Sequence, residues 1–134
     1  MIENDVISIL EADAILDGYL SSGSSDSRFY PVLAPQDTVA PYITFKSTVA
    51  ELDENIDEDR IQLTINAGLS VALLLNIRNR IKTLLDKQDT IVIASNDYYI
   101  YYSKLTASEC YVTPDTEEYI EVMFFNIKFN CKSC

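Results

Sequence analysis

The sequence predicts an α+β fold, with a mostly antiparallel β-sheet and two helices packed on one face. Two segments repeat apolar residues at helical spacing, and several shorter ones alternate apolar with polar residues as strands do. The expected order is helix, strand, strand, helix, strand, strand, strand. With 134 residues, 48% of them hydrophobic, the chain can bury a core, and we expect a single domain over residues 1–134.

The first helix is expected over residues 3–20. Acids at its start suit the helix dipole, and its apolar stripe comprises Ile2, Val6, Ile9, Ala12, Leu16 and Leu20. The small polar residues of "SSGSSDS" then predict a flexible, Ser-rich loop over about 21–27.

The segment "RFYPVLAPQDTVAPYITF" carries three of the four prolines in the chain. Each proline favours an extended conformation for the residue before it and prevents a helix. We therefore expect an extended arm that crosses the surface and leads into a strand at Pro41. The arm is either a preformed contact segment or a stiff crossover between helix and sheet.

A hairpin is expected next. Residues 42–49 and 60–66 alternate as strands, and Ile61, Leu63 and Ile65 point inward while Gln62, Thr64 and Asn66 point outward. The loop between them, about 51–59, is strongly acidic, and the carboxylates expected to line a water-filled lumen or a docking surface are Asp53, Glu54, Asp57, Glu58 and Asp59. Its spacing resembles a calcium loop, but Glu58 replaces the glycine of the sharp turn and Thr64 replaces the terminal bidentate glutamate. We therefore expect no calcium site.

A second helix is expected over residues 68–87, capped by Ser70, with a buried stripe of Leu74, Ile77, Ile81 and Leu84. Its basic C-terminal half either matches the helix dipole or pairs with the acidic loop. Strands are expected over 90–95, 97–105 and 119–131, and the last one places Phe125, Ile127, Phe129 and Cys131 on one face. A tyrosine-rich strand leaves aromatic area on both faces, and the candidate contact residues are Tyr30, Tyr42, Tyr99 and Tyr101.

Catalysis has little support in the composition. The chain contains no histidine, which removes the commonest general base, and only three glycines, which are too few for a phosphate-binding loop. The three cysteines, Cys110, Cys131 and Cys134, are too few for a tetrahedral zinc site without histidine, and we expect incidental thiols. The net charge of −11 argues against wrapping nucleic acid. We expect no enzyme activity, no metal and no cofactor.

The order of these parts resembles the tail-completion, or tail terminator, proteins of long-tailed bacteriophages and related prophages. The resemblance centres on "YPVLAPQDTVAPYITF" and "IQLTINAGLSVALLLNIRNRI" and covers residues 2 to about 130. The acidic loop and the "CKSC" tail have no counterpart in that pattern.

The resemblance implies a structural virion protein that catalyses nothing, uses no cofactor and forms a ring, with six copies of itself as the expected assembly. Such a ring caps the tail tube, ends tail polymerisation and joins the tail to the head connector. Its partners would be itself, the tube protein and the connector protein, while DNA passes without specific binding and no membrane is involved. It would reside in the virion, and in the host cytoplasm during assembly. The alternatives are another neck, head-closure or minor tail component, and a non-phage cytosolic binding module.

Overall fold

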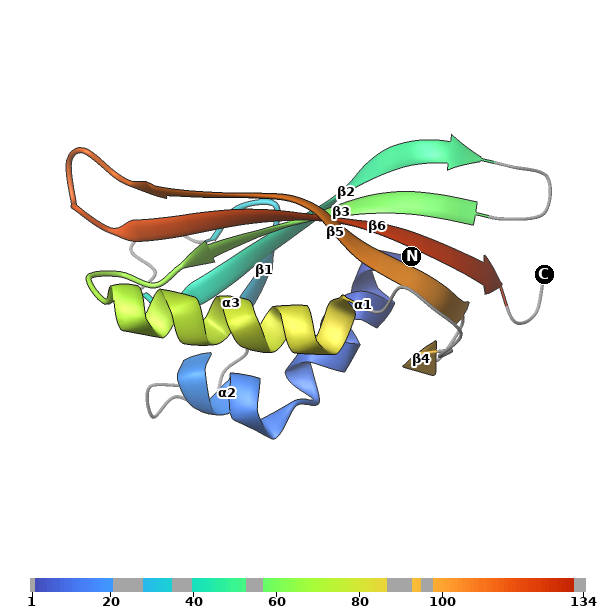
Figure 1. Ribbon diagram of the computed structural model, residues 1–134, viewed down its shortest axis with the longest axis horizontal. Helices are drawn as coiled ribbons and strands as arrows, with labels where there is room; N and C mark the ends of the chain where they lie inside the picture. Colours follow the sequence, from blue (N-terminus) through green and yellow to red (C-terminus); the bar gives the residue numbers. More distant parts are fainter. Residues whose placement is uncertain are drawn as a thin grey trace.

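The computed structural model describes residues 2–20, 28–34, 40–52, 57–86, 93–94 and 98–131 of the chain. These residues form three helices and six strands, and the helices lie on one side of a single sheet (Figure 1). The strand order is β1-β2-β3-β6-β5-β4, and the described strands pair antiparallel except for β1 with β2. The predicted α+β class and mostly antiparallel sheet are confirmed.

The N-terminal segment forms two helices, α1 (Ile2–Glu11) and α2 (Ala14–Leu20), so the prediction of one continuous helix is wrong. The chain breaks at Asp13, whose carboxylate accepts a hydrogen bond from the Leu16 N–H at 2.8 Å and so caps α2. Because of this break the buried face also differs from the predicted stripe. Ala12 is exposed and Ile9 half-buried, and the buried residues are Val6, Ile7, Leu10, Leu16 and Leu20.

The proline-rich arm contains a short strand that the pattern did not predict, β1 (Phe29–Pro31), which runs parallel to β2 (Tyr42–Leu52). Immediately after it, Val32 has a φ of 63°, a left-handed conformation that is rare for a β-branched residue. The peptide bond from Ala40 to Pro41 is cis. Residues 35–39 of the arm, like the Ser-rich segment 21–27, lie outside the described residues.

The predicted hairpin is present, since β2 pairs antiparallel with β3 (Asp57–Asn66). Both strands extend further than predicted, and residues 53–56 between them lie outside the described part. One predicted orientation is wrong: Asn66 is 6% exposed. Its burial is possible because its amide bonds to the Tyr42 hydroxyl at 3.1 Å and to the Glu118 carboxylate, and accepts from the Gly68 N–H at 2.9 Å.

The third helix, α3 (Val71–Leu85), begins as predicted, because the Ser70 side chain accepts a hydrogen bond from the Leu73 N–H at 3.2 Å. Gly68 precedes it with a φ of 68°, and a Cβ there would lie 3.2 Å from that of Ala40, so glycine suits this turn on both counts. The buried face comprises Leu74, Ile77, Ile81 and Leu85. The prediction of Leu84 is wrong, because Leu84 is half-buried and Leu85 is the buried residue at this end of the helix.

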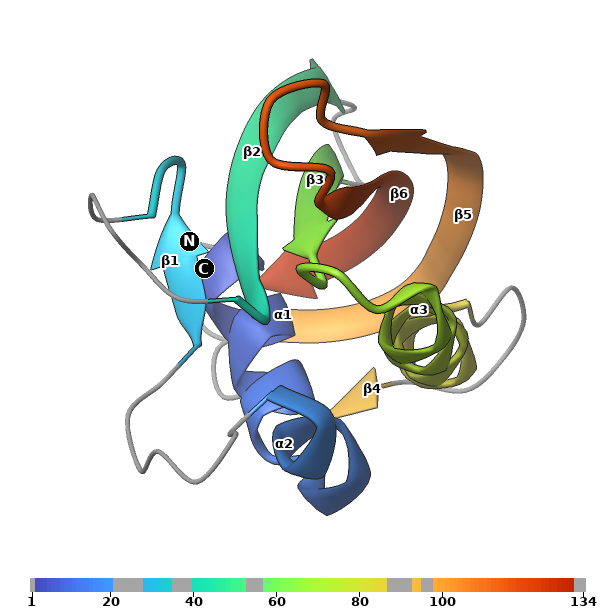
Figure 2. The ribbon, with the colours of Figure 1, turned by 90° about the vertical axis from the view of Figure 1, so that its left-hand side faces the viewer.

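The last strands are β4 (Ile93–Ala94), β5 (Tyr98–Val112) and β6 (Tyr119–Cys131). β5 is longer than predicted, whereas β6 has the predicted bounds. Phe125, Ile127 and Phe129 point into the core between sheet and helices, as expected from their alternation. The sheet twists strongly along its length, as the end-on view in Figure 2 shows.

Candidate assembly surfaces

Two of the predicted contact tyrosines lie together on the β1–β2 side of the sheet. The rings of Tyr30 and Tyr42 meet edge to face, with centroids 6.1 Å apart and an interplanar angle of 77°. Both side chains are half-buried, and the Tyr42 hydroxyl accepts from Asn66. The pair therefore joins the short strand β1 to the sheet, and leaves part of each ring on the surface.

The other two predicted tyrosines, Tyr99 and Tyr101, lie on β5, but their side chains are outside the described part of the structure. The neighbouring Tyr102 is described. The Lys128 ammonium of β6 stands over its ring, 4.9 Å from the centroid, in a cation–π contact.

The predicted acidic residues fall into three groups. Asp53 and Glu54 lie outside the described residues, and Asp57 and Glu58 belong to β3, where only their backbone is described. Asp59 is half-buried: its carboxylate accepts hydrogen bonds from the Ser47 hydroxyl and from the Arg60 N–H. Of the five acids, Asp59 is thus tied into the sheet.

Both edges of the described sheet are partly open. On one side, β1 pairs with only three residues of β2, from Ile43 to Phe45. On the other side, β4 pairs only with Tyr99 and Ile100 of β5. Among the described residues, no further strand pairs with the outer side of β2 or β5, although the Leu105 N–H of β5 donates to the Asp86 side chain at 3.2 Å. Unpaired backbone groups of this kind are able to pair with a strand of another chain.

Exposed apolar side chains gather where the β5–β6 hairpin meets the start of α3. The Tyr119 N–H donates to the Gly68 carbonyl at 2.8 Å, and Tyr119 stands opposite Val112 across the hairpin, so these segments are neighbours. Together they form what we call the apolar end, which comprises Leu69, Val71, Leu75, Tyr111 and Val112. Leu69 is 76% exposed, a high value for a leucine in a folded domain.

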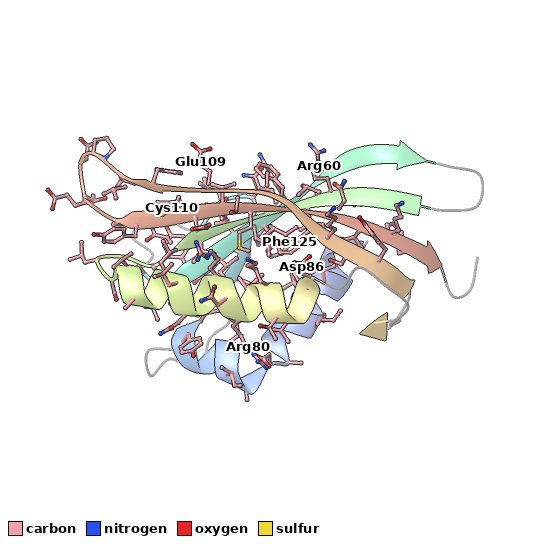
Figure 3. The ribbon with its side chains drawn as sticks, in the orientation of Figure 1. Arg60, Arg80, Asp86, Glu109, Cys110 and Phe125 are labelled. Atoms are coloured by element: carbon pink, nitrogen blue, oxygen red, sulfur yellow. The ribbon has the colours of Figure 1, made fainter. Side chains whose placement is uncertain are left out.

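The face of the sheet opposite the helices carries basic and amide side chains. Arg60 of β3 and Lys104 of β5 both stand opposite Asn126 of the intervening strand β6. Arg60 points away from the helices (Figure 3), and its Nε donates to the Asn126 side-chain oxygen at 3.3 Å. We call this region the basic face, and define it as Lys46, Arg60, Gln62, Lys104, Asn126 and Lys128.

A polar cluster lies between α3 and the hairpin, on the side of the sheet that faces the helices. The Glu121 side chain is 2% exposed and lies 3.8 Å from the Arg78 guanidinium. Cys110 stands opposite Glu121 and points to the helix side, away from Glu109 (Figure 3). Desolvation, and then the Glu121 carboxylate, raise the pKa of the Cys110 thiol, while Arg78 acts in the opposite direction. We therefore expect the thiol to be a weak nucleophile at neutral pH.

The described side chains give little support for a metal site or for catalysis. They include no group of three His, Cys, Asp or Glu residues that could hold a metal ion. Of the other cysteines, Cys131 ends β6, and Cys134 lies outside the described part. Among the described helices, none is long and apolar enough to cross a membrane.

The sequence pattern did not predict the basic face or the apolar end. Arg60 and Lys104 are 44 positions apart, and only the pairing of both strands with β6 makes them neighbours. A signal for the apolar end was present: Leu69 and Leu75 flank the buried helical stripe that begins at Leu74. Recognising it required knowing which helix face meets the sheet.

No protein-family model and no curated protein matches this sequence. The fold, however, is similar to a chain of the solved structure "Virion of native gene transfer agent (GTA) particle", with a TM-score of 0.73. The match covers 96% of this chain and 93% of that chain, at 11% sequence identity. The two chains therefore share a fold over nearly their whole lengths.

Proposed function

We propose that the protein is a structural component of a phage or phage-derived particle, in which it forms a ring on the end of the tail tube. The observation that carries the proposal is the fold shared over nearly the whole chain with a component of a gene transfer agent virion. In this role it ends tail polymerisation and joins the tail to the head connector. It works in the virion, and in the host cytoplasm during assembly.

The surfaces of the chain support an architectural role. A ring needs two different contact surfaces on each copy, because every copy touches one neighbour with each. The partly open edges at β1–β2 and at β5 lie on opposite sides of the sheet and offer such a pair. The apolar end offers a third surface, suited to the tube or the connector.

The proposal contains no catalytic step, cofactor or metal. Its partners are further copies of the chain, in a ring of six, the tube protein and the connector protein. DNA passes through the ring without being bound specifically. The net charge of −11 suits this passage, because a negative lumen repels phosphates.

The test is electron microscopy of the protein mixed with tail tubes purified from the same particle. We expect a ring on one end of the tube, and tubes of uniform length when tube protein polymerises in its presence. The variant Leu69→Asp places a charge in the apolar end and should weaken binding to the tube or connector. Its matched control is Ile15→Asp, which changes an exposed residue of α2.

Other outcomes separate the alternatives. A ring that binds isolated connectors but leaves tube length uncontrolled would identify a head-closure component. A protein that stays monomeric when mixed with tubes and with connectors would contradict the whole proposal and leave a binding module of another kind.

A further inference from the structure

We propose that, within the ring, the tip of the proline-rich arm of one copy packs against an apolar seam between α3 and β5 of the next copy. The inference rests on the proposed ring and assigns one of the contacts that hold it together. The arm tip consists of Val32 and Leu33, which directly follow β1. The seam consists of four side chains, Val71 and Leu75 of α3 and Cys110 and Val112 of β5.

The arm tip presents two apolar side chains on a tight turn. The Leu33 N–H donates to the Pro31 carbonyl at 2.6 Å, which closes a three-residue turn around Val32. The Val32 N–H donates to the Phe45 carbonyl of β2 at 2.8 Å, which ties the turn to the sheet. Val32 is 71% exposed and Leu33 is 80% exposed. The backbone of the turn is therefore fixed, while both apolar side chains face water.

The conformation of Val32 is itself unfavourable. Its φ of 63° crowds a β-branched side chain against the backbone, whereas glycine adopts the same φ without that cost. Strained residues of this kind cluster at binding sites, where the strain holds a group in position for its partner. Neither Val32 nor Leu33 belongs to the hydrophobic core, so the strain does not serve packing within the chain. The arm tip is therefore suited to a contact with another molecule.

One side of α3 follows β5 along the sheet (Figure 2). Arg78 reaches across to Glu121 of β6, the strand that pairs with β5, and the two side chains lie 3.8 Å apart. Asp86, directly after the helix, accepts a hydrogen bond from the Leu105 N–H of β5 at 3.2 Å. Because Asp86 comes about two helical turns after Arg78, both contacts come from the same side of the helix.

The seam lies on that side of α3. Val71 and Leu75 precede Arg78 by seven and three residues, so they share its side of the helix. Cys110 points toward the helices (Figure 3), and Val112 points the same way, because side chains two residues apart on a strand share a face. All four seam residues are exposed. They form an apolar strip beside the outer edge of β5, which, among the described strands, β4 covers for two residues.

The arm tip and the seam lie at opposite sides of the sheet. The strand order places β1 at one edge, and β5 is next to the last strand at the other edge. Figure 2 shows β1 on one side of the molecule and β5 with α3 on the other. Because the two surfaces differ and lie on opposite sides, each copy can offer one of them to each neighbour, as a ring requires. Leu69 and Tyr111, the rest of the apolar end, remain available to the tube or the connector.

The charges beside the two surfaces agree with this pairing. Residues 28–34 of the arm contain one charged residue, Arg28, and no acid, in a chain of net charge −11. The hairpin turn that follows Val112 carries the exposed acids Asp115 and Glu117. These acids repel a partner that presents further acids, but they do not repel an arm tip that has none. The arm of a second copy is therefore an occupant that this otherwise acidic surface accepts.

Two single variants test the contact. Leu33→Asp changes the arm tip, and Leu75→Asp changes the seam; both side chains are exposed, so both variants should fold, as urea denaturation would show. Each should weaken self-association by about tenfold or more, because a charge would be buried in an apolar contact. Ile15→Asp, which changes an exposed apolar residue of α2, is the matched control and should leave association unchanged. Sedimentation velocity measures association in solution, and microscopy scores rings on tube ends.

A mixture of the two variants gives the sharpest test. The arm variant keeps an intact seam and the seam variant keeps an intact arm tip, so each pair can form one contact. The mixture should therefore yield dimers of one copy of each variant, and these dimers cannot close a ring. Native mass spectrometry identifies them when one variant carries nitrogen-15, and on tube ends the mixture should give no closed ring. Dimers made of a single variant would contradict the head-to-tail pairing.

Val32→Gly separates the contact from a structural role of the turn. Glycine relieves the strained φ and removes the apolar side chain, so the urea midpoint should rise while self-association weakens. A turn that acts only through the fold would change both properties in the same direction, and that result would overturn the contact.

The remaining outcomes keep this contact distinct from the proposed function. Rings on tube ends that are unaffected by Leu33→Asp and Leu75→Asp would overturn the contact and leave the proposed function standing. Rings of Leu33→Asp that form in solution but no longer bind tubes would overturn it too, and would assign the arm tip to the tube. If the wild type forms no ring either in solution or on tubes, both proposals fail.

Discussion

Asp13, at the break between α1 and α2, and Arg80 of α3 form a bidentate ion pair, with N–O distances of 2.8 and 2.6 Å. The same carboxylate caps α2 through the Leu16 N–H. One side chain therefore starts a helix and joins it to another that lies 67 residues further along the chain. This double role explains why the N-terminal segment bends at Asp13 and does not continue as one helix.

The first prediction concerns the cap. Asp13→Ala removes the cap and the ion pair and should lower the free energy of unfolding by about 1 kcal/mol, within a range of roughly 0.5–2 kcal/mol. Asp13→Asn keeps a capping oxygen and should lose less. Urea denaturation of both variants and the wild type measures the differences. Equal stabilities for the alanine variant and the wild type would show that the cap does not stabilise α2.

The second prediction concerns pH. The hydrogen bond from Arg80 lowers the pKa of Asp13, although partial burial acts in the opposite direction. A carboxyl group whose pKa is lower in the folded state stabilises the fold fully above its unfolded value, about 3.9, and loses this effect as the pH falls through the folded value. The stability difference between the wild type and Asp13→Asn should therefore be constant from about pH 5 to 7 and shrink below about pH 4.

Denaturation of both proteins across this pH range makes the measurement. Asp17→Asn, an exposed acid of α2, is the control for removing one negative charge. A difference between wild type and Asp13→Asn that stays constant down to pH 3 would contradict the lowered pKa.

Prediction from the sequence was most accurate where the structure of a segment depends on residues within that segment. The alternation in 119–131 is long and regular, and the bounds of β6 were predicted correctly, as was the cap of α3 at Ser70. Prediction failed where the structure depends on contacts with residues that are distant in the sequence. The helix break depends on Arg80, the short strand β1 depends on β2, and the burial of Asn66 depends on Tyr42 and Glu118.

The same distinction holds for the surfaces. Tyr30 and Tyr42 could be nominated singly as aromatic contacts, but their edge-to-face packing follows from the register of β1 on β2. The basic face has no linear motif, since each of its four cations comes from a different strand. Periodicity within a strand gives the face on which a residue lies, and the register between strands gives its neighbours.

The third prediction tests the core. Phe125 is fully buried in the core between sheet and helices, so Phe125→Ala should destabilise the fold by about 3–5 kcal/mol. Its neighbour Phe124 lies on the opposite face of β6 and is only half-buried, so Phe124→Ala should cost clearly less. Equal losses in urea denaturation would mean that the sheet buries both faces equally, as it would inside a stable oligomer.

The fourth prediction concerns Cys110. Because desolvation and Glu121 raise its pKa, the thiol should react slowly with iodoacetamide near pH 7 and faster as the pH rises. Glu121→Gln removes the second cause and should lower the pKa, so alkylation at a fixed pH should accelerate. Peptide mapping by mass spectrometry resolves this site from Cys131 and Cys134. An unchanged rate in the variant would show that the carboxylate does not act on the sulfur.

The last prediction concerns the pair of Arg78 and Glu121, which connects α3 to β6. At 3.8 Å the contact is long, and Oε2 of Glu121 and Nε of Arg78 are buried without a hydrogen-bond partner among the described residues. Arg78→Met leaves the buried carboxylate without its counterion and should destabilise the fold by about 1–3 kcal/mol. Adding Glu121→Met removes the stranded charge and should recover most of that loss, because a buried ion pair replaced by apolar side chains is often neutral.

A double-mutant cycle in urea measures both effects. If Arg78→Met alone is neutral, water reaches the carboxylate and the cluster is not sealed by α3. If the double variant is as stable as the wild type, the pair adds no net stability. Its role then lies in holding the hairpin against α3, and, on the proposed function, this same variant should bind tube ends less well although it is fully folded.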